Sequence, residues 1–188
     1  YCADVGRGWE VFATEGEEVE ELELPGETVV KRAKDPTALV DGDRVLVAYS
    51  DGRLPGHDIS IVETEDLRAT RVVVESVVHS QLVEQGNTWA RTHIHAGKLA
   101  RAGEYYVLFY DAVPTKPKAF GSGWLGVAVS RDLREWVDLT PATPLWRGSG
   151  PDRTFRYVDL LCDGSRYVLY AEEEQPSGRK DLVAYHEP

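Results

Sequence analysis

Carboxylates, histidines and arginines stand at corresponding places along this chain, each beside a short apolar run. Asp35, Asp159 and Glu172 are the candidates for acid and base chemistry, because a pair of carboxyl groups can protonate a leaving oxygen and activate an attacking water. Those two roles suit cleavage of a glycosidic bond. The side chains suited to holding sugar hydroxyls and sugar C–H faces are Asp51, Trp89, Arg91, His93, His95, Asp111, Trp124 and Arg156.

An internal repeat indicates which elements would position these side chains. A turn glycine followed by a β-branched and aromatic run occurs at Gly42, Gly103 and Gly164, which are evenly spaced. An apolar run precedes each glycine, at residues 37–40, 96–100 and 157–162, so each site predicts a hairpin of two strands. Two units continue with third runs at 59–64 and 125–130 and fourth runs at 71–78 and 136–139.

The fold predicted from these units is all-β, a β-propeller of four-stranded antiparallel blades. We assign one domain over residues 1–188, with blade units at about residues 34–80, 91–145 and 155–188. The third unit has three strands, and we expect strand-like runs within residues 1–33 to complete it and so protect its edge. Three blades fall below the four to eight that close a ring, which favours a longer parent chain or closure through a partner chain.

Blade geometry predicts that the polar side chains meet. In an up-and-down blade, the start of the first strand and the end of the second lie on the same edge. First strands begin near Asp35, His93 and Arg156, and second strands end near Asp51 and Asp111. We therefore expect a funnel at one face, close to the axis where the inner strands crowd together.

The motifs of this chain resemble those of one family of sugar-acting propellers. They are Asp35-Pro36, the turn Asp41-Gly42, and the phrase running from Ala128 to Trp136, which reads A-x-S-x-D-L-x-x-W. Over roughly residues 34–188 the sequence resembles the five-bladed β-propeller glycosidases of glycoside hydrolase family 43, the arabinanase and β-xylosidase group, and their invertase and levansucrase relatives.

The resemblance implies roles for three carboxylates. It implies an aspartate general base at the start of an innermost strand, a second aspartate that tunes the acid, and a glutamate that is the acid. Asp35 matches the base. The stretches where the other two would be sought read Arg91 to Gly97 and Arg156 to Asp159, and they depart from the family pattern.

We therefore expect Asp35 to act as the base and a glutamate of the run 172–174, Glu172 foremost, as the acid. Each has a structural alternative, since Asp35 precedes a proline as turn residues do and the glutamate run resembles a solvated loop. His93 and His95 alternate to one face of a strand, where they would contact the ligand, line the wall or join a carboxylate around a metal. The Pro/Gly-rich segment 113–123 is either a lip over the site or a plain loop.

The proposed acid and base chemistry uses only side chains of the protein. We assign no metal ligands and expect no required cofactor, while the resemblance allows a calcium ion in the central channel. The chain has no strand-to-helix phosphate loop, no G-x-S-x-G elbow and no H-E-x-x-H pair, so phosphate-binding, serine-nucleophile and zinc-protease chemistry are set aside.

Composition limits the partners. The 188 residues carry 32 acidic against 21 basic side chains, a formal net charge of −11, so nucleic acid and anionic membranes are poor partners. No apolar run approaches membrane-spanning length, which predicts a soluble protein that is either cytoplasmic or secreted with its leader removed. Cys2 and Cys162 are the only cysteines, and we expect both to be reduced.

Three function classes remain open from the sequence. The first is a glycosidase acting on oligosaccharides or glycosides. The second is a non-catalytic carbohydrate-binding propeller, which keeps the polar and aromatic lining but needs no acid. The third is a partial propeller whose open edges assemble with another subunit.

Overall fold

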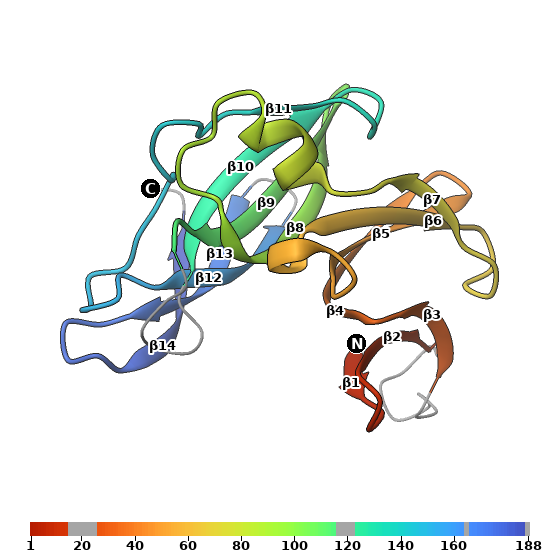
Figure 1. The fold of residues 1–188 in the computed structure, drawn as a ribbon, viewed down its shortest axis with the longest axis horizontal. Helices are drawn as coiled ribbons and strands as arrows, with labels where there is room; N and C mark the ends of the chain where they lie inside the picture. The colour runs from red at the N-terminus through yellow and green to blue at the C-terminus, as the bar shows by residue number, and fades with distance from the viewer. Residues whose placement is uncertain (15–25, 116–122, 164–165, 187–188) are drawn as a thin grey trace.

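The strands form four antiparallel sheets in the computed structural model, which describes residues 1–14, 26–115, 123–163 and 166–186 (Figure 1). The all-β architecture of propeller blades predicted from the repeat is confirmed. The first sheet contains β1 (Cys2–Asp4), β2 (Trp9–Ala13) and β3 (Glu27–Lys31), and the second contains β4 (Ala33–Asp41), β5 (Arg44–Asp51), β6 (Ile59–Thr64) and β7 (Arg71–Val74). The third contains β8 (Thr92–Ala102), β9 (Tyr105–Val113), β10 (Trp124–Ser130) and β11 (Trp136–Asp138), and the fourth contains β12 (Phe155–Asp163), β13 (Arg166–Glu174) and β14 (Lys180–His186).

The sheets follow one another in space in the order of the chain. β4 contacts β8, β8 contacts β12, and the strands β1 and β2 contact β4. Figure 1 shows the resulting arc, with the β1–β3 sheet at one end and the β12–β14 sheet at the other. The first strands of three successive sheets, β4, β8 and β12, therefore lie next to one another at the inside of the arc.

The N-terminal strands correct one expectation from the sequence. They do not add to the last sheet; β1, β2 and β3 pair with one another and form a sheet of their own. The reason is the short connection, since only Arg32 separates β3 from β4, and its φ of 56° turns the chain sharply. Val11 and Val29 then pack on β4–β7, against Val47 and other buried side chains of that sheet.

The main core lies between the β4–β7 and β8–β11 sheets. Leu46, Ile59, Ile61, Ile94 and Leu108 are fully buried there. A π-helix at Val78–Val83 (η3) also contributes Val78 and Leu82 to this core, although the sequence pattern indicated no helix.

The buried carboxylate of Asp58 explains where that short helix begins. It accepts hydrogen bonds from the backbone N–H groups of Val78 and His79 at 2.9 and 2.8 Å, which satisfies donors that a helix start leaves open.

The S-x-D-L-x-x-W phrase is a turn with a packing tryptophan. Asp132 Oδ1 accepts the backbone N–H groups of Arg134 and Glu135, both at 2.9 Å, and Leu133 takes a left-handed φ of 68°. The fully buried Trp136 donates its Nε1–H to the Leu133 carbonyl at 2.9 Å. Asp66 makes the same turn in the preceding sheet, with the N–H groups of residues 68 and 69.

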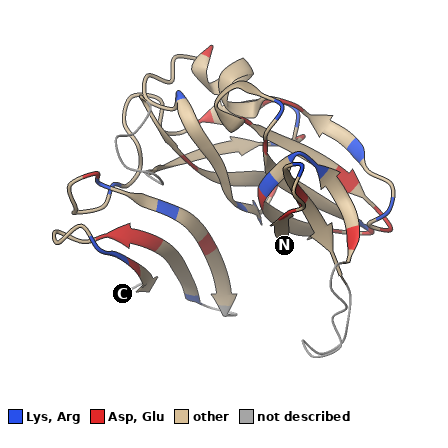
Figure 2. Ribbon diagram, turned by 60° about the horizontal axis from the view of Figure 1, so that its bottom comes forward, with Lys and Arg blue, Asp and Glu red and all other residues tan. Residues whose placement is uncertain are grey.

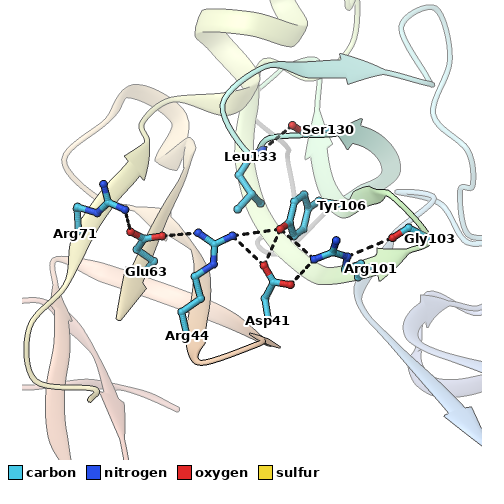
Figure 3. A network of polar contacts seen from close by, with 9 residues as sticks. All are labelled: Asp41, Arg44, Glu63, Arg71, Arg101, Gly103, Tyr106, Ser130 and Leu133. Atoms are coloured by element: carbon cyan, nitrogen blue, oxygen red, sulfur yellow. Dashed lines mark hydrogen bonds and ion pairs between the residues drawn. The ribbon is translucent and has the colours of Figure 1, made fainter. Parts of the chain in front are cut away.

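Charged side chains join neighbouring sheets at the edge formed by the β4–β5 and β8–β9 turns (Figure 3). Asp41 accepts hydrogen bonds from Arg44, Arg101 and Tyr106 Oη, the last at 2.7 Å. Arg44 also pairs with Glu63 at 2.7 Å. These contacts tie the turn of one sheet to the next sheet and lower the pKa of Asp41, with the Tyr106 hydrogen bond the largest cause.

Two further observations concern the chain as a whole. Cys2 is partly buried and Cys162 is exposed, and neither is joined to another cysteine. Within the described ranges, no helix has the length and apolar character needed to cross a membrane.

We predict that Asp41→Asn lowers the free energy of unfolding by about 1–2 kcal/mol at pH 7, because an ionised acceptor is lost from a partly exposed network. The folded-state pKa of Asp41 lies below its ordinary value of 3.8. Its contribution is therefore complete above that value and is lost as the pH falls through the folded-state pKa. Urea unfolding of wild type and variant should thus converge in acid, whereas Asp43→Asn, an exposed neighbour, should match wild type throughout. A constant difference down to pH 2 would contradict the prediction.

Candidate functional site

The three innermost strands share a backbone irregularity close to their starts. The pairing register shifts between residues 34 and 37 in β4, between 92 and 95 in β8, and between 156 and 159 in β12. At each shift one residue takes a positive φ: Asp35 at 50°, His93 at 50° and Tyr157 at 53°. Such values are uncommon for residues other than glycine. The shared register shift and positive φ show that the same bulge occurs in three sheets, which places these three side chains at equivalent positions.

Asp35 occupies the first of these positions. Its Oδ2 atom is buried and has no hydrogen-bond partner in the described part of the chain. Lys34 Nζ lies 3.7 Å away and His95 Nε2 lies 4.0 Å away. The carboxylate therefore keeps an unused acceptor atom between two nitrogen groups, with about a fifth of its side chain exposed.

A buried carboxylate on the neighbouring strand orients His95. Asp111 Oδ1 accepts a hydrogen bond from His95 Nδ1 at 2.7 Å, and both side chains are almost fully buried. This bond assigns the proton to Nδ1 and turns Nε2 toward Asp35. Residues from β4, β8 and β9 thus form the chain of contacts Asp111–His95–Asp35.

Tyr157 on β12 packs against the same group. Its ring lies 5.8 Å from that of His95, and its backbone N–H donates to Asp111 Oδ2 at 3.4 Å. Burial, followed by the negative charge of Asp35, raises the pKa of Tyr157 to about 12. The phenol therefore remains a hydrogen-bond donor at neutral pH, and 41% of the residue is exposed to meet a ligand.

Glu172 forms an ion pair on the β12–β14 sheet. Arg156 Nε donates to Glu172 Oε1 at 2.7 Å, and the Arg156 guanidinium carbon lies 4.3 Å from the centre of the Tyr157 ring. Arg156 is 8% exposed, while 28% of the Glu172 side chain is accessible. Arg156 thus connects Glu172 to the aromatic ring that packs on His95.

His57 joins the cluster from the loop after β5. It is exposed and takes a φ of 61°. Partial desolvation lowers its pKa, followed by the positive charges of Lys34, His95 and His93, while Asp35 opposes the shift. His57 is therefore close enough to the Asp35 group for its pKa to respond to the charges there.

The remaining residues predicted from sequence lie in other surroundings. Asp51 is fully buried and is held by Arg53 and Ser60. Asp159 is exposed and pairs with Lys98 at 2.7 Å, and Arg91 is exposed with its backbone N–H bonded to Val113.

The two tryptophans predicted to bind sugar are engaged in packing. Trp89 is 3% exposed, stacks on Tyr110 and donates Nε1–H to the Thr140 carbonyl at 2.7 Å. Trp124 has Arg147 over its ring at 4.1 Å. Their roles toward a ligand remain predictions, as does that of the 113–123 segment, of which residues 116–122 lie outside the described residues.

Sequence reasoning missed Tyr157 and Lys34. A signal for Tyr157 was present, because it lies as far before the turn glycine Gly164 as Asp35 lies before Gly42. In β8, His93 lies further from Gly103 than Asp35 lies from Gly42, and a second register shift between Ala96 and Lys98 accounts for part of the difference.

Metal binding gains no support from the geometry. In the described ranges, no three side chains of His, Cys, Asp or Glu are grouped so as to hold a metal ion. The calcium ion allowed by the resemblance remains a prediction.

Sheets arranged in an arc, with polar side chains presented by their innermost strands, define a fold of the β-propeller class. The sequence matches no protein-family model and no curated protein. The fold matches β-propeller glycoside hydrolases. An exo-1,5-α-L-arabinanase from a bovine ruminal metagenomic library superposes with a TM-score of 0.59 at 15% identity, over 95% of this chain and 64% of that chain.

Two further solved structures have the same fold. An α-L-arabinofuranosidase from Lactobacillus brevis gives a TM-score of 0.59 at 13% identity, over 82% of this chain and 48% of that chain. A thermostable family-43 glycoside hydrolase gives 0.55 at 12% identity, over 84% and 54%. This chain spans about half the length of most such structures. The propeller fold expected from the resemblance is thereby confirmed, while identities this low leave activity to be argued from the site.

We predict that Lys34→Gln raises the pKa of His57 toward its ordinary value of 6.5, because one of the cations opposing protonation is removed. Histidine NMR titration measures this directly. Arg179→Gln, on the distant β13–β14 turn, serves as the control and should leave the titration unchanged. An unchanged or lowered pKa of His57 in Lys34→Gln would show that the two side chains do not interact.

Proposed function

We propose that this chain is a glycosidase-like protein that hydrolyses glycosidic bonds of oligosaccharides with Asp35 as the general base. The observation that carries the proposal is the buried Asp35 Oδ2, which lacks a hydrogen-bond partner within the described residues and stands between Lys34 and His95. A buried acceptor without a partner is costly unless a ligand or water uses it. The arabinanase and arabinofuranosidase folds support the choice of sugar chemistry.

The proposed reaction begins with a water held by Asp35. The carboxylate accepts a proton from this water as the oxygen attacks the anomeric carbon, and the bond to the leaving oxygen breaks. The Lys34 ammonium group lies 3.7 Å from the carboxylate and favours its ionised form, while Asp111 fixes the orientation of the neighbouring His95. Tyr157 offers an O–H donor to a sugar hydroxyl at the same place. No cofactor takes part in these steps.

The second carboxylate of the proposal is Glu172. A general acid gives its proton to the leaving oxygen, whereas Glu172 here accepts a hydrogen bond from Arg156. The assignment therefore requires substrate to separate this pair and take the place of the guanidinium. Asp159, exposed and paired with Lys98, is the alternative carboxylate on the same strand as Arg156.

Asp35→Asn should reduce hydrolysis by about 10²–10⁴-fold, because the amide cannot accept the proton from water. The measurement is a screen of aryl arabinofuranosides, xylosides and galactosides and of fructose-containing sugars, with wild type and variant side by side. Asp43→Asn is the matched control, an exposed aspartate on the β4–β5 turn, and should retain full activity. Equal turnover by Asp35→Asn would remove Asp35 from the mechanism.

Glu172→Gln should affect activity differently on substrates with poor and with good leaving groups. If Glu172 protonates the leaving oxygen, the variant loses activity on natural oligosaccharides but keeps most of it on activated aryl glycosides, whose leaving group needs no proton. Comparing the two substrate types by kcat provides the test. A loss that is the same for both types would assign Glu172 to binding instead.

A specific observation favours a second candidate function, assembly with another subunit. The β12–β14 sheet packs on the β8–β11 side through Phe155, Val158 and Ala171, while Leu161 and Leu182 are 50% and 77% exposed. The register places these two leucines on the opposite face. Solution mass by light scattering tests assembly.

If no sugar is cleaved but sugars raise the melting temperature, the non-catalytic binding propeller is the better description.

A further inference from the structure

A pocket apart from the Asp35 group lies beside the N-terminal sheet. Its volume is about 260 Å³, and its lining comes from the β1–β2 connection, the start of β2 and the end of β3. The residues around it are Arg7, Gly8, Trp9, Glu10, Lys31 and Arg32. Drug-sized ligands occupy roughly 300–1,000 Å³, so this pocket suits a smaller unit such as one sugar ring.

The pocket is cationic on a chain whose net charge is −11. Three basic side chains line it against one carboxylate, and that carboxylate, on the buried Glu10, lies 3.6 Å from Arg7. Lys31 and Arg32 are exposed and form no ion pair within the described part of the chain. Among the described residues, these two cations therefore have no carboxylate partner and are available to an anionic ligand.

Trp9 gives the pocket an apolar wall. The residue is 46% exposed although it begins a β-strand, so part of the indole is accessible to a ligand. An exposed indole beside cationic side chains can contact the C–H face of a sugar ring while the cations bind its charged group. Simple anions such as phosphate would use the cations but gain nothing from the indole.

The pocket and Asp35 lie on the same edge of the molecule. Arg32 leads directly into β4, whose start carries Asp35, and β3 runs into β4 in Figure 1. The Arg32 carbonyl accepts a hydrogen bond at 2.8 Å from Gly52, which follows the end of β5. The pocket residue Arg32 and Asp35 are therefore three residues apart in the chain, next to the end of β5.

We propose that this pocket binds the uronate unit of an acidic oligosaccharide. The carboxylate of the sugar pairs with Lys31 and Arg32, and the ring lies against Trp9. The proposal rests on the proposed function for the sugar nature of the ligand, and it deepens that function by assigning an acidic substrate class. Binding is measured without catalysis, so a failure here differs from a failure of Asp35 as base.

The test is calorimetric binding of trigalacturonate and of its neutral methyl ester to the chain carrying Asp35→Asn, which leaves the pocket residues intact. We expect the acid to bind about tenfold more tightly than the ester, with the difference lost in Lys31→Gln/Arg32→Asn. Asn is chosen because it tolerates the left-handed φ of Arg32. Arg166→Gln, an exposed arginine that does not line the pocket, controls for the general loss of charge.

Further outcomes distinguish the ligand classes. Trp9→Ala should weaken binding of acid and ester alike, and raising NaCl from about 50 to about 500 mM should weaken the acid alone. If the double variant unfolds, Lys31→Gln alone carries the test and should weaken acid binding. Equal affinity of acid and ester, wild-type affinity in the double variant, or tighter binding of polyphosphate than of trigalacturonate would overturn the proposal.

Discussion

The bulge at the start of the innermost strands is the constraint on which the candidate site depends. A regular strand would point alternate side chains to opposite faces, and Asp35 would then follow the pleat of β4. The left-handed φ at Asp35, His93 and Tyr157 interrupts the pleat in three successive sheets. Such conformations cost free energy and persist only where the surrounding structure imposes them. The register shifts that enforce them also bring Asp35, His95 and Tyr157 into one group.

The two edges of the sheets carry different kinds of charge arrangement. At the turn edge, Asp41 is saturated with donors from Arg44, Arg101 and Tyr106, and the result is an attachment between sheets. At the other edge, Asp35 keeps an acceptor without a partner among the described residues. Saturated networks rigidify a fold, while unsatisfied buried groups are rare and call for an explanation. The contrast is a physical reason to look for chemistry at Asp35 rather than at Asp41.

The fold could be predicted from the sequence more fully than the candidate site could. The evenly spaced Gly42, Gly103 and Gly164 marked the hairpins because a tight turn between two apolar runs is a local property. Asp35 was found through its resemblance to a family motif. Lys34 was missed because its role depends on a bulge, and Tyr157 because its only signal was a distance to Gly164 that matches the distance from Asp35 to Gly42. The separate β1–β3 sheet was missed because the neighbour on which β2 packs is decided by the Arg32 turn, a tertiary constraint.

One short segment connects the site to the cationic pocket. Lys31 and Arg32 line the pocket, and Lys34 stands 3.7 Å from Asp35. In a continuous strand these side chains would alternate between two faces, but the left-handed φ at Arg32 separates β3 from β4 and lets the segment serve both places. On a chain of net charge −11, gathering cations here favours approach of an anionic ligand to this edge. Under the proposed function, these cations would orient an acidic substrate before its glycosidic bond reaches Asp35.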